Sequence, residues 1–347
     1  LEHFYWGSVF LVNLPVGIIA LTLGAFLIPS SKDPNPRAID MKGFILSIAM
    51  VGLLVFTVIE GPHQGWMSFR TLASFAATIL LFALFILCEL KTEEPLLDVR
   101  VFRNPRISAA TGSISAAFFV LFGFTFLVTQ YFQFVRGYST LSAGLHTLPF
   151  AFGAGITAPI AARLALKFGT KRVVAHGLLN MSIGLVIMGF CGANAPYWGP
   201  VVIAMLFLAS GLGLVTSPAT DAVMGSLPAE RAGIGSAIND VGREVGGTLG
   251  VAISGSVFAS LYGPKIVELI SNFGLPEDVV AIAKQSAGAG FAVAEMAPTP
   301  EAAEAIRGAV SEAFMHGFHA ASFTGAGVAL VGSLCAWKFL PARNRSI

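Results

Sequence analysis

The chain consists of long apolar stretches separated by short polar segments. Nine stretches are long enough to cross a bilayer as helices, because about 20 apolar residues span about 30 Å of hydrocarbon. They lie near residues 6–28, 42–60, 70–90, 108–134, 142–164, 173–193, 199–219, 244–263 and 318–339. A backbone inside a bilayer must satisfy its polar groups within the segment, which favours helices. The pattern therefore predicts an all-α membrane protein with about nine transmembrane helices.

The eighth stretch is rich in small residues. Gly246, Gly250 and Ser254 recur at every fourth position and so share one helix face. Small side chains allow two membrane helices to approach closely. We therefore expect this face to pack against a neighbouring helix and not against lipid.

One long connection, 264–317, separates the last two stretches. Within it, residues 276–278 (Pro-Glu-Asp) and 299–301 (Thr-Pro-Glu) each have the proline and the acidic residue typical of a first helical turn. Two short surface helices are predicted there. The connection forms either a simple extracytoplasmic cap or an element that gates the protein or binds a partner.

The composition agrees with a bilayer environment. Hydrophobic residues make up 55% of the 347 residues and charged residues 12%, about half the share usual in soluble domains. A net charge of +2 without a basic stripe argues against a nucleic-acid partner. Cys88, Cys191 and Cys335 are widely spaced within apolar stretches, which predicts buried packing residues and neither a metal site nor disulfides.

Basic residues predict the side on which each loop lies, because Lys and Arg in short loops are retained in the cytoplasm. With the N-terminal end outside, only five of the 21 basic residues fall outside: Arg70, Arg136, Lys265, Lys284 and Arg307. The other 16 lie in the inner segments. This bias predicts Leu1 outside and the C-terminus in the cytoplasm.

The start of the chain indicates that further helices precede it. Leu1 is not an initiator Met, no basic signal-peptide region is present, and an aromatic run from His3 to Trp6 leads directly into the first apolar stretch. We expect missing N-terminal helices to complete the protein.

Enzyme motifs are absent from the sequence, which lacks Gly-x-Ser-x-Gly, His-Glu-x-x-His, a Gly-x-x-x-x-Gly-Lys loop and a Cys/His cluster. Transport, with no catalytic residue, metal or cofactor, is the simpler hypothesis. Uncommon polar groups within the spans are then the candidates for a substrate or proton pathway. These candidates are Asn13, Gln130, Gln133 and Arg136.

Each candidate also has a structural interpretation. Asn13 either faces a cavity or caps the helix defect at the nearby proline. Gln130 and Gln133, three positions apart on one helix face, either bind a ligand or link helices. Arg136 either pairs with Glu60, meets a substrate or proton at the exit, or is a solvated charge.

Three segments have recognisable features. Residues 6–18 read WGSVFLVNLPVGI, residues 129–149 read TQYFQFVRGYSTLSAGLHTLP, and residues 232–255 read AGIGSAINDVGREVGGTLGVAISG. They resemble the sixth helix, the ninth-to-tenth helix connection and the approach to the thirteenth helix of the EmrB/QacA-like drug:proton antiporters of the major facilitator superfamily. The resemblance implies the major facilitator fold, with helices six to fourteen of fourteen present.

The resemblance also implies a domain arrangement. Residues 1–28 would form the last helix of the N-terminal bundle. Residues 29–107 would form two extra linking transmembrane helices with cytoplasmic loops. Residues 108–347 would form the C-terminal six-helix bundle, which includes the extracytoplasmic loop 264–317.

The segment ARLALKFGTKR, residues 162–172, resembles the second, degenerate copy of the superfamily's cytoplasmic loop motif. A Gly and an acidic residue of the first copy are replaced by Ala162 and Leu166. The matching residues are Arg163, Lys167, Gly169, Lys171 and Arg172. The loop either anchors the helix ends or acts as a conformational latch.

The resemblance implies efflux of small amphipathic organic compounds across a bacterial inner membrane by alternating access. Proton antiport would supply the energy from the proton gradient, with no cofactor, and the partners would be the lipid bilayer, the substrate and protons. Two alternatives stay open. The chain is a non-transporting fragment or a partner subunit that needs a separate N-terminal bundle, or the same fold carries another solute.

Overall fold

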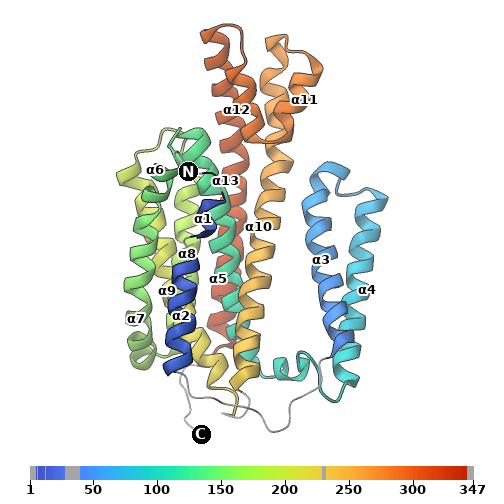
Figure 1. Cartoon of the computed structure of the whole chain (residues 1–347), viewed down its shortest axis with the longest axis vertical. Helices are drawn as coiled ribbons and strands as arrows, with labels where there is room; N and C mark the ends of the chain where they lie inside the picture. The colour runs from blue at the N-terminus through green and yellow to red at the C-terminus, as the bar shows by residue number, and fades with distance from the viewer. Residues whose placement is uncertain (1–4, 6, 12, 28–39, 229–231, 342–347) are drawn as a thin grey trace. The chain divides into compact units, whose positions relative to one another are not determined.

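The structure, a computed structural model, describes residues 5, 7–11, 13–27, 40–228 and 232–341. In these residues the regular structure is entirely helical (Figure 1). The chain divides into two compact units, residues 1–40 and 41–347. We describe the two units separately.

The first unit contains α1 (Ser8–Leu11) and α2 (Asn13–Leu27), which occupy the first predicted span. α2 is a 15-residue apolar helix that has no buried residue. Val12 and residues 28–39 lie outside the described part, so the full length of this predicted span is not covered.

The second unit begins with two antiparallel helices, α3 (Met41–Gln64) and α4 (Phe69–Lys91). A short turn joins them, in which Gly65 has a φ of 85° that favours glycine. α3 packs against α10 (Ala232–Ile270), where the Ser256 hydroxyl donates to the Val58 carbonyl at 2.8 Å. This contact attaches the helix pair to the rest of the unit.

The remainder of the unit is a bundle of long helices with shorter pieces at their ends. The long helices are α5 (Pro105–Gln130), α7 (Leu148–Phe168), α8 (Thr170–Gly189), α9 (Val202–Met224), α10 and α13 (Pro300–Phe339). The short pieces are η1 (Val99–Arg103), η2 (Tyr131–Val135), α6 (Thr140–His146), η3 (Tyr197–Val201), η5 (Ser271–Phe273), α11 (Glu277–Gln285) and α12 (Ala287–Glu295).

Eight helical segments of the described chain are long and apolar enough to cross a membrane. Together with the shorter α2, they lie at the nine predicted positions. In particular, the uncharged stretch 173–220 forms two separate helices, α8 and α9, in agreement with the two spans predicted there. The predicted fold class, an all-α membrane protein, is confirmed.

α10 and α5 pack along a line of small residues. A Cβ atom added to Gly246 or Gly250 would collide with the backbone carbonyl of Ser115 or Phe119 on α5. Ser254, one turn further along, faces Gly123 in the same way. The two backbones are therefore in direct contact, which small residues alone permit.

The prediction of a second short surface helix, starting near residue 299, is wrong. Thr299 begins a helix as expected, and its hydroxyl accepts a hydrogen bond from the Ala302 amide at 3.2 Å. The helix that follows is α13, which runs for 40 residues to Phe339 without interruption, so the helix that contains the ninth predicted span begins at residue 300 and not at 318. α11 matches the first predicted surface helix, whereas α12 was not predicted.

Tertiary contacts explain this difference. The first residues of α13 are too polar for their sequence to predict a transmembrane helix. Ile306 and Val310 are nevertheless buried there against neighbouring helices. α10 likewise continues beyond the predicted limits of 244 and 263. The ends of α10 and α13 form one packed projection with α11 and α12 (Figure 1).

Candidate substrate-binding region

The helix type changes at the point where the candidate glutamines lie. α5 ends at Gln130, and η2 continues the same helix as a π-helix. A π-turn has i→i+5 hydrogen bonds and is wider than an α-turn. Gln130 and Gln133 line two different cavities, so the expectation that they share one face is wrong.

Gln133 lines a cavity of about 400 Å³ between α5, α6, α7 and α9. We call it the Gln133 cavity. Its apolar wall includes Phe124, Phe150 and Met205, and the two phenyl rings lie 6.4 Å apart. The volume lies within the range of roughly 300–1,000 Å³ typical of small-molecule sites.

The polar groups of the Gln133 cavity differ in their availability. The hydroxyls of Thr125, Thr129 and Thr147 each donate to a carbonyl of their own helix at 2.6–2.8 Å. The half-buried Gln133 side chain has no hydrogen bond with any described residue. Its amide can therefore donate to, and accept from, a bound molecule.

Gln130 lines a separate cavity of about 490 Å³ between α3, α5, α10, α11 and α12. Its amide nitrogen lies 3.3 Å from the Phe126 carbonyl in its own helix. Lys284, His63 and Tyr262 also line this cavity. It is the more polar of the two, and it lies close to the projecting helices.

Arg136 lies just after η2 and binds backbone carbonyls. Its guanidinium donates to Ala193 at 3.2 Å and to Ala195 at 2.8 Å, and it reaches the Tyr138 hydroxyl at 3.4 Å. The expected pair with Glu60 is not formed, because these carbonyls from the α8–η3 connection already occupy the guanidinium. Neither is Arg136 a fully solvated charge.

The charge of Arg136 is permanent. Burial opposes the charge, but the hydrogen bond and the phenols of Tyr138 and Tyr131 outweigh burial, so the pKa of Arg136 lies above its usual value. An arginine does not release its proton in proteins at physiological pH. The residue therefore joins η2 to the α8–η3 connection and is not a proton carrier.

An aromatic cluster lies next to η2. The imidazole of His146 lies 4.3 Å from the Tyr138 ring and 4.4 Å from the Tyr197 ring, measured between centroids. The Tyr197 hydroxyl donates to the His146 carbonyl at 2.9 Å, and Phe132 packs 6.1 Å from the imidazole. The members come from η2, the η2–α6 connection, α6 and η3, and sequence spacing gave no sign that they meet.

The loop-motif residues lie at the junction of α7 and α8. Gly169, with a φ of 87°, ends one helix and begins the next, a conformation that strongly favours glycine. The Lys171 ammonium lies 5.8 Å from the Trp337 ring on α13. Arg163, Lys167 and Arg172 are exposed.

The predicted pathway residues of the second unit do not form one site. Gln130 and Gln133 lie on separate cavities, and Arg136 binds the α8–η3 connection. Asn13 belongs to the first unit, where it is exposed on α2. Among the described residues no cluster of three or more His, Cys, Asp or Glu side chains could hold a metal ion.

Comparison with known proteins shows the family to which these features correspond. A family model described as Major Facilitator Superfamily matches residues 1–251. The multidrug resistance protein Stp of Mycobacterium tuberculosis is 34% identical over 259 residues, which is 75% of this chain and 48% of that protein. The multidrug efflux pump LfrA of Mycolicibacterium smegmatis is 32% identical over 307 residues, 88% of this chain and 59% of that protein.

A third relative matches almost the whole chain. The tetracenomycin C resistance and export protein of Streptomyces glaucescens is 30% identical over 345 residues, 96% of this chain and 63% of that protein. The chain thus spans about half to two thirds of the length of the curated relatives it matches.

Proposed function

The chain belongs to the major facilitator superfamily, and on this premise we propose that it exports small amphipathic organic compounds in exchange for protons. The relatives Stp, a multidrug resistance protein, and LfrA, a multidrug efflux pump, support a multidrug substrate class. The segments quoted above support assignment to the EmrB/QacA-like group, with the domain division at residues 28 and 107.

The Gln133 cavity is the observation that carries this proposal. It combines aromatic and aliphatic walls with the side-chain amide of Gln133, which forms no hydrogen bond with a described residue. Such a site holds apolar molecules of different shapes, while a single polar group orients each of them. Gln133 is the residue we assign to substrate binding, and Phe124 and Phe150 provide the apolar surface.

The proton gradient supplies the energy in this proposal, and no cofactor is needed. Arg136 does not carry the proton, because it stays charged. The loop from Arg163 to Arg172 anchors the inner helix ends. The protein lies in the bacterial inner membrane, with the C-terminus in the cytoplasm and the N-terminal end of this chain outside.

Replacement of Gln133 tests the binding site. Gln133→Leu keeps the size of the side chain but removes its hydrogen bonds, so we expect affinity for a polar amphipathic drug such as ethidium to fall about fivefold to tenfold. Binding is measured by ethidium fluorescence with the purified protein. Gln64→Leu, on an exposed position at the end of α3, is the matched control. Equal affinity for all three proteins would remove Gln133 from the site.

Energy coupling needs a separate experiment. Ethidium accumulation is followed in inverted membrane vesicles that contain the chain, alone and together with the N-terminal half of LfrA. We expect an uncoupler to abolish accumulation. Accumulation that resists the uncoupler would refute proton antiport, and its absence under both conditions would refute export by this chain.

A further inference from the structure

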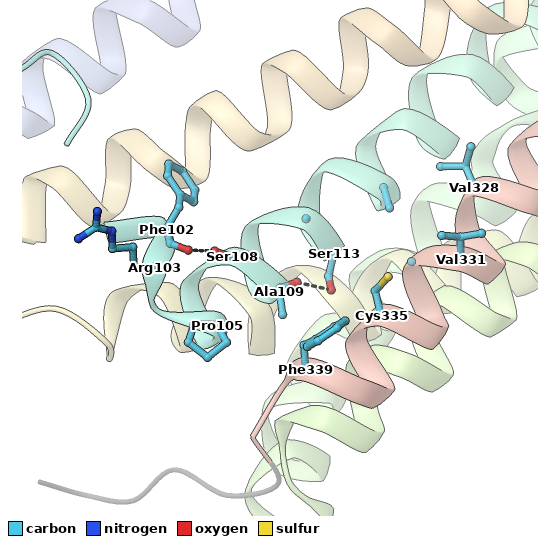
Figure 2. A pocket seen from close by; sticks show the side chains of 13 residues that line it. Phe102, Arg103, Pro105, Ser108, Ala109, Ser113, Val328, Val331, Cys335 and Phe339 are labelled. Carbon is cyan, nitrogen blue, oxygen red and sulfur yellow. Dashed lines mark hydrogen bonds between the residues drawn. The ribbon is translucent and has the colours of Figure 1, made fainter. Parts of the chain in front are cut away.

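A groove of about 630 Å³ lies between α5 and α13 at the end of the bundle where α5 begins and α13 ends (Figure 2). We call it the α5–α13 groove. Its walls include Ala109, Gly112 and Ala116 of α5 and Val328, Val331 and Phe339 of α13. It is separate from the Gln130 and Gln133 cavities, with which it shares no residue.

The depth of the groove matches one leaflet of a bilayer. Its lining runs over residues 105–116 of α5 and over residues 328–339 of α13. At 1.5 Å per residue, each wall is about 16 Å long, which is roughly half the hydrocarbon thickness of about 30 Å. Both walls start at the helix ends that carry the cytoplasmic basic residues, so the groove spans the inner leaflet.

The surface of the groove walls is apolar. The hydroxyls of Ser108 and Ser113 donate to the carbonyls of Phe102 and Ala109, as the dashed lines in Figure 2 show, and are thereby satisfied within the chain. Val331 is 60% exposed, so no other helix of the second unit covers this part of the wall. An apolar occupant can therefore enter from the membrane.

The mouth of the groove is basic. Arg103 lies in η1 at the edge of the groove, is exposed, and has no hydrogen bond or ion pair with a described residue. The Lys338 ammonium lies 5.3 Å from the ring of Phe339, which lines the groove. Arg103 thus lines one end of the apolar groove, and Lys338 lies next to a residue that lines it.

We propose that the α5–α13 groove binds an anionic phospholipid of the inner leaflet. One acyl chain lies along the walls of α5 and α13, and the headgroup phosphate binds Arg103, with Lys338 beside it. Basic pockets between membrane helices on the cytoplasmic side bind anionic headgroups in this way. A transport substrate would not require a groove that ends at headgroup level beside two cations.

Arg103→Gln tests the headgroup contact. We expect the purified chain to retain phosphatidylglycerol in preference to phosphatidylcholine, as counted by native mass spectrometry from mixed micelles. Removal of one cation near the surface should lower that preference about fivefold. Lys91→Gln removes an exposed basic residue at the end of α4, away from the groove, and should leave the preference unchanged. No preference in the unmodified chain, or an equal loss in both variants, would overturn the proposal.

Gly112→Phe tests the acyl-chain contact. A Cβ atom at Gly112 would have no atom within 4 Å, so a phenyl ring fits into the groove and fills it. We expect this variant to lose bound phosphatidylglycerol. Gly52→Phe adds the same ring at an equally open position on α3 and should bind lipid normally. Lipid bound equally well by both variants would contradict the proposal, as would a groove that binds ethidium and not phosphatidylglycerol.

Cys335 provides a reporter within the chain. Although a buried packing residue was predicted, Cys335 is exposed and lines the groove. Cys191 is buried, and burial raises the pKa of its thiol, so it reacts slowly with maleimides and serves as an internal reference. Phosphatidylglycerol in nanodiscs should slow alkylation of Cys335 relative to phosphatidylcholine. Equal rates in the two lipids would count against occupancy of the groove.

Discussion

Single glycines set the distance between α5 and α10. Gly246 and Gly250 lie against the carbonyls of Ser115 and Phe119, and the Ser115 hydroxyl donates to the Gly242 carbonyl at 2.9 Å. Each side chain that is absent from α10 leaves room for backbone of α5. The four-residue spacing of small residues was visible in the sequence, but the partner helix was not.

Gly250→Ala tests this contact. The added methyl group would overlap the Phe119 carbonyl, and overpacking of this kind costs about 1–3 kcal/mol. We expect a lower midpoint of thermal unfolding in detergent. Gly52→Ala, where a Cβ meets nothing within 4 Å, should leave the midpoint unchanged or raise it slightly, since alanine favours a helix. A Gly250→Ala variant as stable as the unmodified chain would show that the helices are not in close contact.

At the scale of elements, the π-helical η2 contains one candidate side chain, Gln133, and directly follows another, Gln130. Tyr131 and Phe132 are both almost fully buried although they are consecutive. The Tyr131 hydroxyl reaches the Gly192 and Ala193 carbonyls, and Phe132 packs against Tyr138. These contacts lie in the wider turn that follows Gln130, and Gln133 lines another cavity than Gln130 does. Helical periodicity assumes a constant turn and therefore placed the two glutamines on one face.

The projection formed by α11 and α12 depends on one tyrosine of α10. The Tyr262 hydroxyl donates to the carbonyls of Ala283 and Ser286 at 3.0 and 3.2 Å, at the junction between the two short helices. Tyr262 itself is 1% exposed. The hydroxyl thus holds the projection against the end of the span.

Tyr262→Phe should loosen this projection without unfolding the bundle. Loss of the buried hydroxyl leaves two carbonyls without this partner, at a cost of about 1–3 kcal/mol. We expect faster amide hydrogen exchange in residues 277–295, measured by mass spectrometry. Tyr197→Phe, which removes a hydroxyl bond to the His146 carbonyl, should leave exchange in residues 277–295 unchanged. Similar exchange in both variants would assign the attachment to apolar packing alone.

At the scale of the whole molecule, the distribution of basic residues predicts the orientation in the membrane. Sixteen of the 21 Lys and Arg residues lie in segments assigned to the inside. The helices of the second unit are long enough to place successive loops on alternate sides. The sign of this bias therefore predicts which end faces the cytoplasm.

Introduced cysteines test that orientation in a chain whose three native cysteines are replaced by serine. Glu301→Cys, in the exposed first turn of α13, should react with a membrane-impermeant maleimide in intact cells. Lys91→Cys, exposed at the end of α4, should react only in inverted vesicles. The opposite pattern would reverse the topology, and labelling of both in intact cells would contradict the span assignment.

The sequence by itself determined those properties that depend only on residues close together along the chain. Apolar length located the spans, and the small residues of α10 predicted a packed face. Proline and acidic residues predicted the start of α11. Segment resemblance indicated the superfamily that the family match later showed. Each of these signals lies within one short segment, so the rest of the fold is not needed to interpret it.

Only the tertiary structure decided which distant segments meet. Arg136 binds carbonyls almost 60 positions away, and the α5–α13 groove joins residues more than 200 positions apart. The alternative that Arg136 pairs with Glu60, and the shared face expected for Gln130 and Gln133, were both wrong. The physical reason is that a guanidinium binds whichever acceptors packing brings to it, and the cavity that a side chain lines depends on the helices packed around it.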